Sequence, residues 1–288
     1  MKTRTLDMIV KDDALQNYLT LLGNDHISSI LNASQLHYLK NTLGDDTPIL
    51  SAVSPALSLT HASQEMIYCP QSFKVEDFNT MIIPALYPAT LSAIKVTGRD
   101  IKEWLEVAAS IYQVPCTENS SLLNHTALTF LFYPIAGLSY TIDIDEPPLF
   151  NQFGEYMNYH VRDGIFHPNL SKGRINEILY QGRAIGHDEE FILIASSFAP
   201  SMRKWRLEGR TFMDIGSPDN RLVLLEYLKN NPCFEQISTS SWSLKSQLKA
   251  GVFLPMPIRN VVVPEYLYDL YDMQVADQEP SGFCINFK

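Results

Sequence analysis

Histidine and cysteine are the side chains that most often bind transition metals or act as bases and nucleophiles. The seven histidines of this chain are scattered along it. The cysteines form no C-x-x-C pair; they are Cys69, Cys116, Cys233 and Cys284. The sequence also lacks a G-x-S-x-G elbow, a P-loop and an H-E-x-x-H helix. These residues therefore predict no metal or nucleophile centre within the chain.

Two acidic segments could contact a ligand or serve the fold. The run His187-Asp188-Glu189-Glu190 precedes an apolar strand, and we interpret it as a solvated turn. Asp219 follows Ser217-Pro218 and precedes a helical pattern, where a carboxylate caps the first backbone amides. A carboxylate can also accept hydrogen bonds from both hydroxyls of a ribose. Both roles are open for Asp219, and Asn220 is either part of the helix start or a ligand contact.

Charge limits the kind of partner. The net charge is −10, from 22 Lys and Arg against 32 Asp and Glu. Binding to duplex nucleic acid needs many basic residues on one face, so this balance argues against it. A single small nucleotide needs only a local site and stays compatible with the sequence. The 14 Tyr, 14 Phe and three Trp must line a core or a pocket.

Targeting signals give little guidance. No window reaches the roughly 18 apolar residues of a membrane helix, so we expect no membrane span. Residues 1–11 have no apolar run long enough for a signal peptide. Sequons of the Asn-x-Ser/Thr type are too short to assign a compartment; they are Asn32, Asn119, Asn124 and Asn169.

The clearest local pattern is a strand, a glycine turn and a helix. Residues 92–97 alternate in polarity, Gly98 turns the chain, and a helix is expected over Arg99–Tyr112. Trp104 lies on the apolar face of this helix with Ile101, Leu105 and Ala108. The pattern therefore predicts that Trp104 is buried and structural.

Helices and strands are interspersed along the rest of the chain. Asp12–Leu43 predicts two amphipathic helices with a turn at 23–25, and 145–172 reads as a long irregular stretch. A hairpin turn is expected at 181–183. Further strands are expected at 49–53, 138–144, 175–180, 191–195, 261–263 and 282–287, and a helix at 220–229. This order favours one α+β domain over 1–288, with a helical lead-in (1–45) and a core (46–288) of mixed sheets, flanking helices and long loops.

Five blocks, in order, resemble the 5′-nucleotidase C-terminal domain family. Its pattern Y-P-N-T-L, then V-K-x-T-G-x-x-[LIV]-K-E-x-L-E, is similar to Leu86–Leu91 and Ile94–Glu106. The later blocks are Gly137–Asp143 (G-V-x-Y-x-I-D), Arg174–Gly182 (R-I-x-N-L-x-x-x-G), Glu190–Phe198 (x-F-x-V-A-T-N-N-Y) and Ser217–Arg221 (S-P-D-E-N-R, one residue shorter). Within the family, the blocks are most similar to the bacterial 2′,3′-cyclic-nucleotide 2′-phosphodiesterase/3′-nucleotidase group.

The resemblance implies a division of labour. In this hydrolase family an N-terminal metallophosphoesterase domain holds two divalent metals, and the C-terminal domain stacks the base of a nucleoside or nucleotide between two aromatic rings. The metal domain's D-x-H and G-N-H-[DE] signatures are absent here; Asn124-His125 lacks the flanking Gly and acid. We therefore expect no cofactor in this chain and two metals in a partner domain. Family members are typically periplasmic or on the cell surface. The alternative is a catalytically inactive binding or interaction protein on the same fold.

The resemblance also suggests the residues of a binding site. Phe198 aligns with one base-stacking ring and Phe130 with the other, with Phe132 or Tyr133 replacing Phe130 if the register shifts. The alternative reading is that both Phe130 and Phe198 are core residues. Asp219 and Asn220 complete the predicted site. Where the family carries Gly-Gly-Arg, this chain has Ser54–His61, without either residue type; Arg203 and Lys204 either compensate or are solvated.

Overall fold

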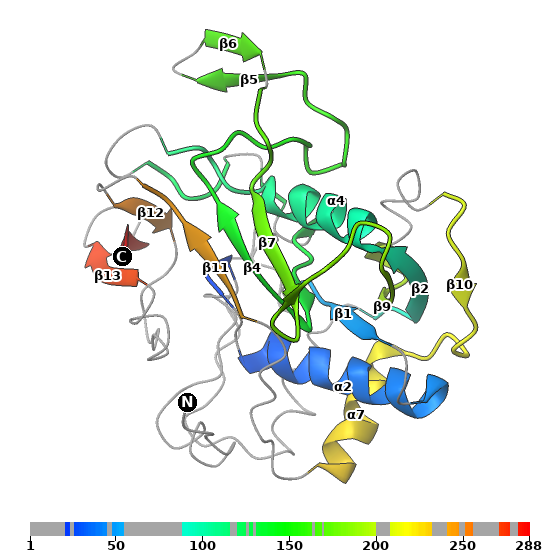
Figure 1. Cartoon of the computed structure of the whole chain (residues 1–288). Helices are drawn as coiled ribbons and strands as arrows, with labels where there is room; N and C mark the ends of the chain where they lie inside the picture. Colours follow the sequence, from blue (N-terminus) through cyan, green and yellow to red (C-terminus); the bar gives the residue numbers. More distant parts are fainter. Residues whose placement is uncertain are drawn as a thin grey trace.

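Helices are interspersed among the strands of mixed and antiparallel β-sheets, which confirms the predicted α+β class (Figure 1). The computed structural model describes residues 21–23, 26–44, 48–54, 88–115, 120–124, 127–128, 131–162, 165–168, 170–199, 208–231, 241–247, 251–255, 271–276 and 282–288. The expected helix before residue 21 and the expected strand at 261–263 lie outside these ranges.

The largest sheet has the strand order β10-β2-β9-β1-β3. Its centre is β9 (Glu190–Ser196), antiparallel to β2 (Leu91–Thr97) and parallel to β1 (Ile49–Ala52). The edges are β10 (Phe212–Met213) and β3 (Ile135–Ala136). Because Ser196 pairs with Leu91 and Ala195 with Ala52, the ends of β9 and β1 and the start of β2 meet at one edge of the sheet.

Both faces of this sheet are covered. Ile192 and Ile194 of β9 pack into a cluster with Leu39 and Val223, which come from helices α2 (His26–Leu43) and α7 (Asn220–Asn230). Phe191, Leu193 and Ala195 face the main core, which also holds residues of helix α4 (Gly98–Ala109) and of the second sheet. A strand buried on two sides needs apolar residues throughout, and this explains the continuous run at 191–195.

The other sheets are smaller. The second has the order β11-β4-β7-β8 and the third β12-β14-β13. Their bounds are β4 (Leu138–Asp143), β7 (Ile175–Tyr180), β8 (Arg183–Ala184), β11 (Ser241–Lys245), β12 (Val252–Pro255), β13 (Tyr271–Ala276) and β14 (Gly282–Phe287). The predicted hairpin turn joins β7 to β8, with positive φ at Gln181 (50°) and Gly182 (79°). This backbone is the primed turn that suits a two-residue hairpin.

The expectation that 145–172 is irregular was wrong in part. β5 (Tyr159–Arg162) and β6 (Ile165–Pro168) pair antiparallel, and Figure 1 shows this hairpin at the top of the view, beyond the two larger sheets. Main-chain hydrogen bonds between the two strands make the ladder, and a hydrophobic period is not needed for it. The order of polar and apolar residues at 159–168 therefore did not indicate these two strands.

Helix α4 (Gly98–Ala109) confirms the predicted strand–turn–helix unit. Thr97 and Asp100 form a reciprocal capping box at its start. The helix ends three residues before the expected Tyr112, because that residue forms a β-bridge with Leu123. Trp104 is 4% exposed, and its indole N–H donates to the carbonyl of Tyr133 at 2.9 Å, so its predicted burial is confirmed.

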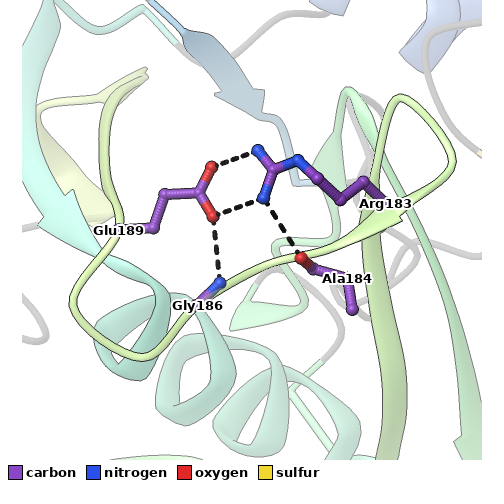
Figure 2. A network of polar contacts seen from close by, with 4 residues as sticks. All are labelled: Arg183, Ala184, Gly186 and Glu189. Atoms are coloured by element: carbon purple, nitrogen blue, oxygen red, sulfur yellow. Dashed lines mark hydrogen bonds and ion pairs between the residues drawn. The ribbon is translucent and has the colours of Figure 1, made fainter.

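The turn between β8 and β9 covers the start of α4 (Figure 2). The carbonyls of Glu189 and His187 accept the backbone amides of Gly98 and Arg99, both at 2.9 Å. Arg183 forms a two-pronged pair with the Glu189 carboxylate at 2.6 and 2.9 Å, and Glu189 also accepts the amide of Gly186 at 2.9 Å. The interpretation of 187–190 as a solvated turn agrees with the exposure of His187, Asp188 and Glu190, and Glu189 in addition fixes the turn that caps α4.

A buried charged pair joins the other end of α4 to β7. Glu106 accepts the backbone amides of Arg174 (2.9 Å) and Ile175 (3.0 Å). The fully buried Arg174 guanidinium donates to the carbonyls of Ala109 and Tyr112, both at 2.8 Å. A cation is stabilised at a helix C-terminus, where carbonyls lack helical partners. The network therefore locks α4 onto the second sheet.

Two tyrosines hold the first described residues. Tyr112 donates its hydroxyl to the carbonyl of Leu21 at 2.7 Å, and Tyr271 donates to that of Leu22 at 3.0 Å. The Tyr271 oxygen also accepts the amide of Leu244 at 2.8 Å. Leu21 and Leu22 are themselves buried, so this entry segment is part of the main core.

Candidate functional site

Three chain segments meet at the sheet edge where β9 ends and β2 begins. They are residues 88–91, 196–199 and 217–221. The amide of Leu91 donates to Pro218 (2.8 Å), and that of Asn220 donates to Ala89 (2.9 Å). Thr90 forms a β-bridge with Asp219 and accepts the amide of Ser197 at 2.7 Å. Thr90 therefore lies between the strand end that carries Phe198 and the helix start that carries Asp219.

Hydroxyl groups line this edge. The Thr90 side chain donates to the Ser197 hydroxyl at 2.9 Å, at an exposed position. The Ser196 hydroxyl accepts the backbone amide of Phe198 at 3.2 Å and so fixes the chain as it leaves β9. A hydroxyl both donates and accepts, so this pair can bind sugar or phosphate oxygens as well as amides.

Phe198 is 38% exposed, while its neighbour Ala199 is buried. This partial exposure at the end of β9 is what a ligand-facing ring requires and what a core ring would not show. Phe130 lies outside the described residues. The register alternatives Phe132 and Tyr133 are buried, packed edge-to-face against Trp242 and Trp104 respectively, and so serve the core. The stacking role of Phe198 and Phe130 stays a prediction.

Asp219 caps helix α7, as its place in the sequence predicts. Its Oδ1 accepts the amide of Arg221 at 2.8 Å. Burial acts to raise the pKa of the Asp219 carboxyl, but hydrogen bonds from the Arg221 side chain and backbone outweigh it and hold the pKa below its ordinary value. Asn220 tethers the same helix start to Ala89, accepting its amide at 3.4 Å. Both residues have a structural role, and their ligand contacts stay predictions.

Arg221 is the residue of this edge that the sequence reasoning missed. Its Nε and Nη2 lie 3.4 Å from Oδ1 and Oδ2 of Asp219, and its side chain is 36% exposed. The signal was present in the sequence, because a residue two places after an N-cap acid lies within reach of it. Arg203, Lys204 and residues 55–61 lie outside the described ranges.

Metal ligands do not gather in the part of the chain that the structure describes. There, no group of three or more His, Cys, Asp or Glu side chains could hold an ion. The described helices include none that is long and apolar enough to cross a membrane.

Residues 70–203 match the sequence model of the family described as 5′-nucleotidase, C-terminal domain. This stretch of the chain is similar to the C-terminal domain of 5′-nucleotidases. The resemblance of the first four blocks is thereby confirmed, and the matched residues include β2, α4, β4, β7 and β9. The start of α7, with Asp219, Asn220 and Arg221, lies beyond the matched range.

Curated relatives of this C-terminal domain are bacterial hydrolases. The chain is 26% identical over 226 residues to the 2′,3′-cyclic-nucleotide 2′-phosphodiesterase/3′-nucleotidase of Yersinia enterocolitica, covering 75% of this chain and 33% of the relative. The enzyme of the same name from Haemophilus influenzae is 26% identical over 227 residues, with the same coverage. The chain thus spans about a third of the length of these relatives, and the assignment to their branch is confirmed.

Solved structures share the fold at low identity. A protein described as a 5′-nucleotidase from Staphylococcus aureus, in complex with α-ketoglutarate, superposes with a TM-score of 0.57 at 13% identity, covering 83% of this chain and 42% of that one. The NAD nucleotidase of Haemophilus influenzae gives a TM-score of 0.51 at 13% identity, with coverage of 83% and 37%. These two structures therefore share the fold of this chain.

Proposed function

We propose that this chain is the nucleoside- or nucleotide-recognition domain of a metal-dependent 5′-nucleotidase or 2′,3′-cyclic-nucleotide phosphodiesterase. The observation that carries the proposal is the partly exposed ring of Phe198 directly after the central strand. Thr90 accepts the amide of Ser197 at this strand end and forms a β-bridge with Asp219, and Asn220 donates its amide to the neighbouring Ala89. A flat ring beside hydroxyl, amide and carboxylate groups suits a base attached to a ribose.

Stacking supplies the affinity in this proposal. Every base offers a flat π-face, and an aromatic side chain under it contributes about 1–3 kcal/mol. Phe198 takes one face of the base, and Phe130 is proposed for the other, about 7 Å away on stacking geometry. The Asp219 Oδ2 has one long contact, to Nη2 of Arg221 at 3.4 Å, and its second lone pair is proposed to accept a ribose hydroxyl.

Hydrolysis belongs to a different set of residues. Two-metal cleavage of a phosphate ester needs a cluster of carboxylate, imidazole and amide ligands. The described residues do not form such a cluster, so they fit the binding step and we assign no bond-breaking step to them. The proposal places both divalent metals in a metallophosphoesterase domain that acts with this one, either as another part of a longer protein or as a partner.

Calorimetric titration with adenosine tests the binding step. We expect wild-type protein to bind and Phe198→Ala to lose about 1–3 kcal/mol of binding free energy, with little change in melting temperature, because a partly exposed ring contributes little to the core. Phe212→Ala is the matched control: Phe212 is 56% exposed but sits on edge strand β10, opposite Ile94. It should bind adenosine like the wild type.

Two outcomes would count against nucleotide recognition. Adenosine, adenosine monophosphate and 2′,3′-cyclic adenosine monophosphate could all fail to bind, which would favour the interaction-protein alternative. Phe198→Ala could instead unfold the domain, which would show that the ring belongs to the core.

A further inference from the structure

We propose that Arg221 recognises the phosphate group of the bound nucleotide, with Asp219 holding its guanidinium at the edge where Phe198 lies. This inference rests on the proposed function and adds a specificity residue to it. Arg221 stands outside the sequence range that matches the family model.

The first support is placement. The β-bridge between Thr90 and Asp219 sets the start of α7 beside the residue that precedes β2. The amide of Ser197 donates to Thr90 from the other side, one residue before Phe198. The backbone of Arg221 thus belongs to the same group of three adjoining segments as Phe198, whose ring is proposed to hold the base.

The second support is the geometry of the guanidinium. A guanidinium has five N–H donors. Asp219 faces the side made by Nε and one hydrogen of Nη2, at 3.4 Å for each nitrogen. These are long contacts, and they leave the end made by Nη1 and the second hydrogen of Nη2 as a fork. Such a fork matches two oxygens of a phosphate.

The third support is charge. The chain carries a net charge of −10, which opposes the approach of an anionic ligand. Segments 88–91, 196–199 and 217–221 contain one basic residue, and it is Arg221. Asp219 by itself would repel a phosphate, and its pairing with Arg221 removes that penalty while it keeps the cation in place. The hydroxyls of Thr90 and Ser197 can add hydrogen bonds to the same phosphate oxygens.

The experiment compares ligands with and without a phosphate. Adenosine, adenosine 5′-monophosphate and 2′,3′-cyclic adenosine monophosphate are titrated into wild-type protein and into Arg221→Gln by calorimetry. We expect the affinity of Arg221→Gln for both phosphate-bearing ligands to fall about fivefold to twentyfold, and its affinity for adenosine to stay within about twofold. Arg221→Lys keeps the charge without the fork and should lie between.

Arg183→Gln is the matched control. Arg183 is also exposed and paired with an acid, but Glu189 lies at the opposite end of β9, about 20 Å away for a seven-residue strand. It should leave all three affinities unchanged.

The outcomes separate the two proposals. If Arg221→Gln and Arg221→Lys both bind all three ligands like the wild type, the phosphate role is wrong and the nucleoside site stands. An equal loss for adenosine and its phosphates would assign Arg221 a structural role and overturn the inference. If wild-type protein binds none of the three, the proposed function fails and this inference fails with it.

Discussion

Glu106 and Arg174 are linked through the backbone, because each charged side chain forms hydrogen bonds to main-chain atoms of the segment that carries the other. The Glu106 carboxylate accepts the backbone amide of Arg174 at 2.9 Å, while the Arg174 guanidinium donates to Ala109 at the end of the helix that carries Glu106. Burial is the main influence on the Glu106 carboxyl and raises its pKa. Burial likewise lowers the pKa of Arg174 to about 10. Each group depends on hydrogen bonds to the backbone for its place in the core.

Glu106→Gln should therefore destabilise the domain by about 2–4 kcal/mol. Glutamine keeps one acceptor oxygen but turns an NH₂ donor toward an amide that also donates. Urea unfolding followed by circular dichroism measures the loss. Glu226→Gln, at an exposed position of α7, is the matched control and should change stability by less than about 0.5 kcal/mol. Equal effects of the two substitutions would show that the buried amides do not need the carboxylate.

Gly98 should not tolerate a methyl group, although Gly186 beside it should. A Cβ on Gly98 would lie 2.1 Å from the Gly186 carbonyl oxygen, whereas a Cβ on Gly186 meets only Glu189 side-chain atoms at 3.7 and 3.9 Å. We expect Gly98→Ala to cost about 1–3 kcal/mol, because backbone must move to admit it. Gly186→Ala should stay within about 0.5 kcal/mol. Thermal melts of the two variants decide the point, and a stable Gly98→Ala protein would contradict it.

Trp104→Ala should cost about 3–5 kcal/mol, the usual loss for a large core aromatic. The ring is 4% exposed, and its N–H bond to Tyr133 would also be lost. Leu222→Ala, at a side chain 64% exposed on α7, serves as the control for truncation of an apolar residue and should be nearly neutral. An unchanged denaturation midpoint for Trp104→Ala would mean that α4 packs in another orientation.

The ion pair and hydrogen bonds of Glu189 should break only at strongly acidic pH, because the pKa of its carboxyl is low. Hydrogen bonds from Arg183, and then from the Gly186 amide, lower the pKa of Glu189 from 4.5 to about 2. Because the unfolded chain binds the proton more readily, this contribution to stability is present above about pH 4.5 and is lost as the pH falls through about 2. Carbon-13 NMR of the Glu189 carboxyl measures the pKa directly. In Arg183→Gln it should move up toward 4.5, and no movement would contradict the role of Arg183.

Local patterns predicted those elements whose signals lie within a few residues. The bounds of β7 and β14 agree with the sequence, and Asp219 caps α7 as its position before an apolar run indicates. Such features depend on alternation, turn residues and caps, which neighbours in the chain determine.

Contacts across long sequence separations could not be predicted in the same way. Arg174 precedes a strand and looks like a solvated residue in the sequence, yet its partner Ala109 lies 65 residues earlier. The site edge depends on the pairing of Thr90 with Ser197, which are 107 residues apart. The family resemblance pointed to Phe198, but neither alternation nor spacing indicates that Thr90 joins it to the start of α7.

The hydrogen bond between Tyr271 and Leu22 also bears on how the protein is made. These residues are 249 positions apart. At the roughly 5–20 residues per second of protein synthesis, Leu22 is made about 12–50 s before Tyr271, which supplies the hydroxyl that donates to it. During that time a core residue of the growing chain lacks the donor that finally satisfies it. The contact between Leu22 and β13 therefore forms only after synthesis has passed Tyr271, and a chain truncated before Tyr271 lacks the hydroxyl that donates to Leu22.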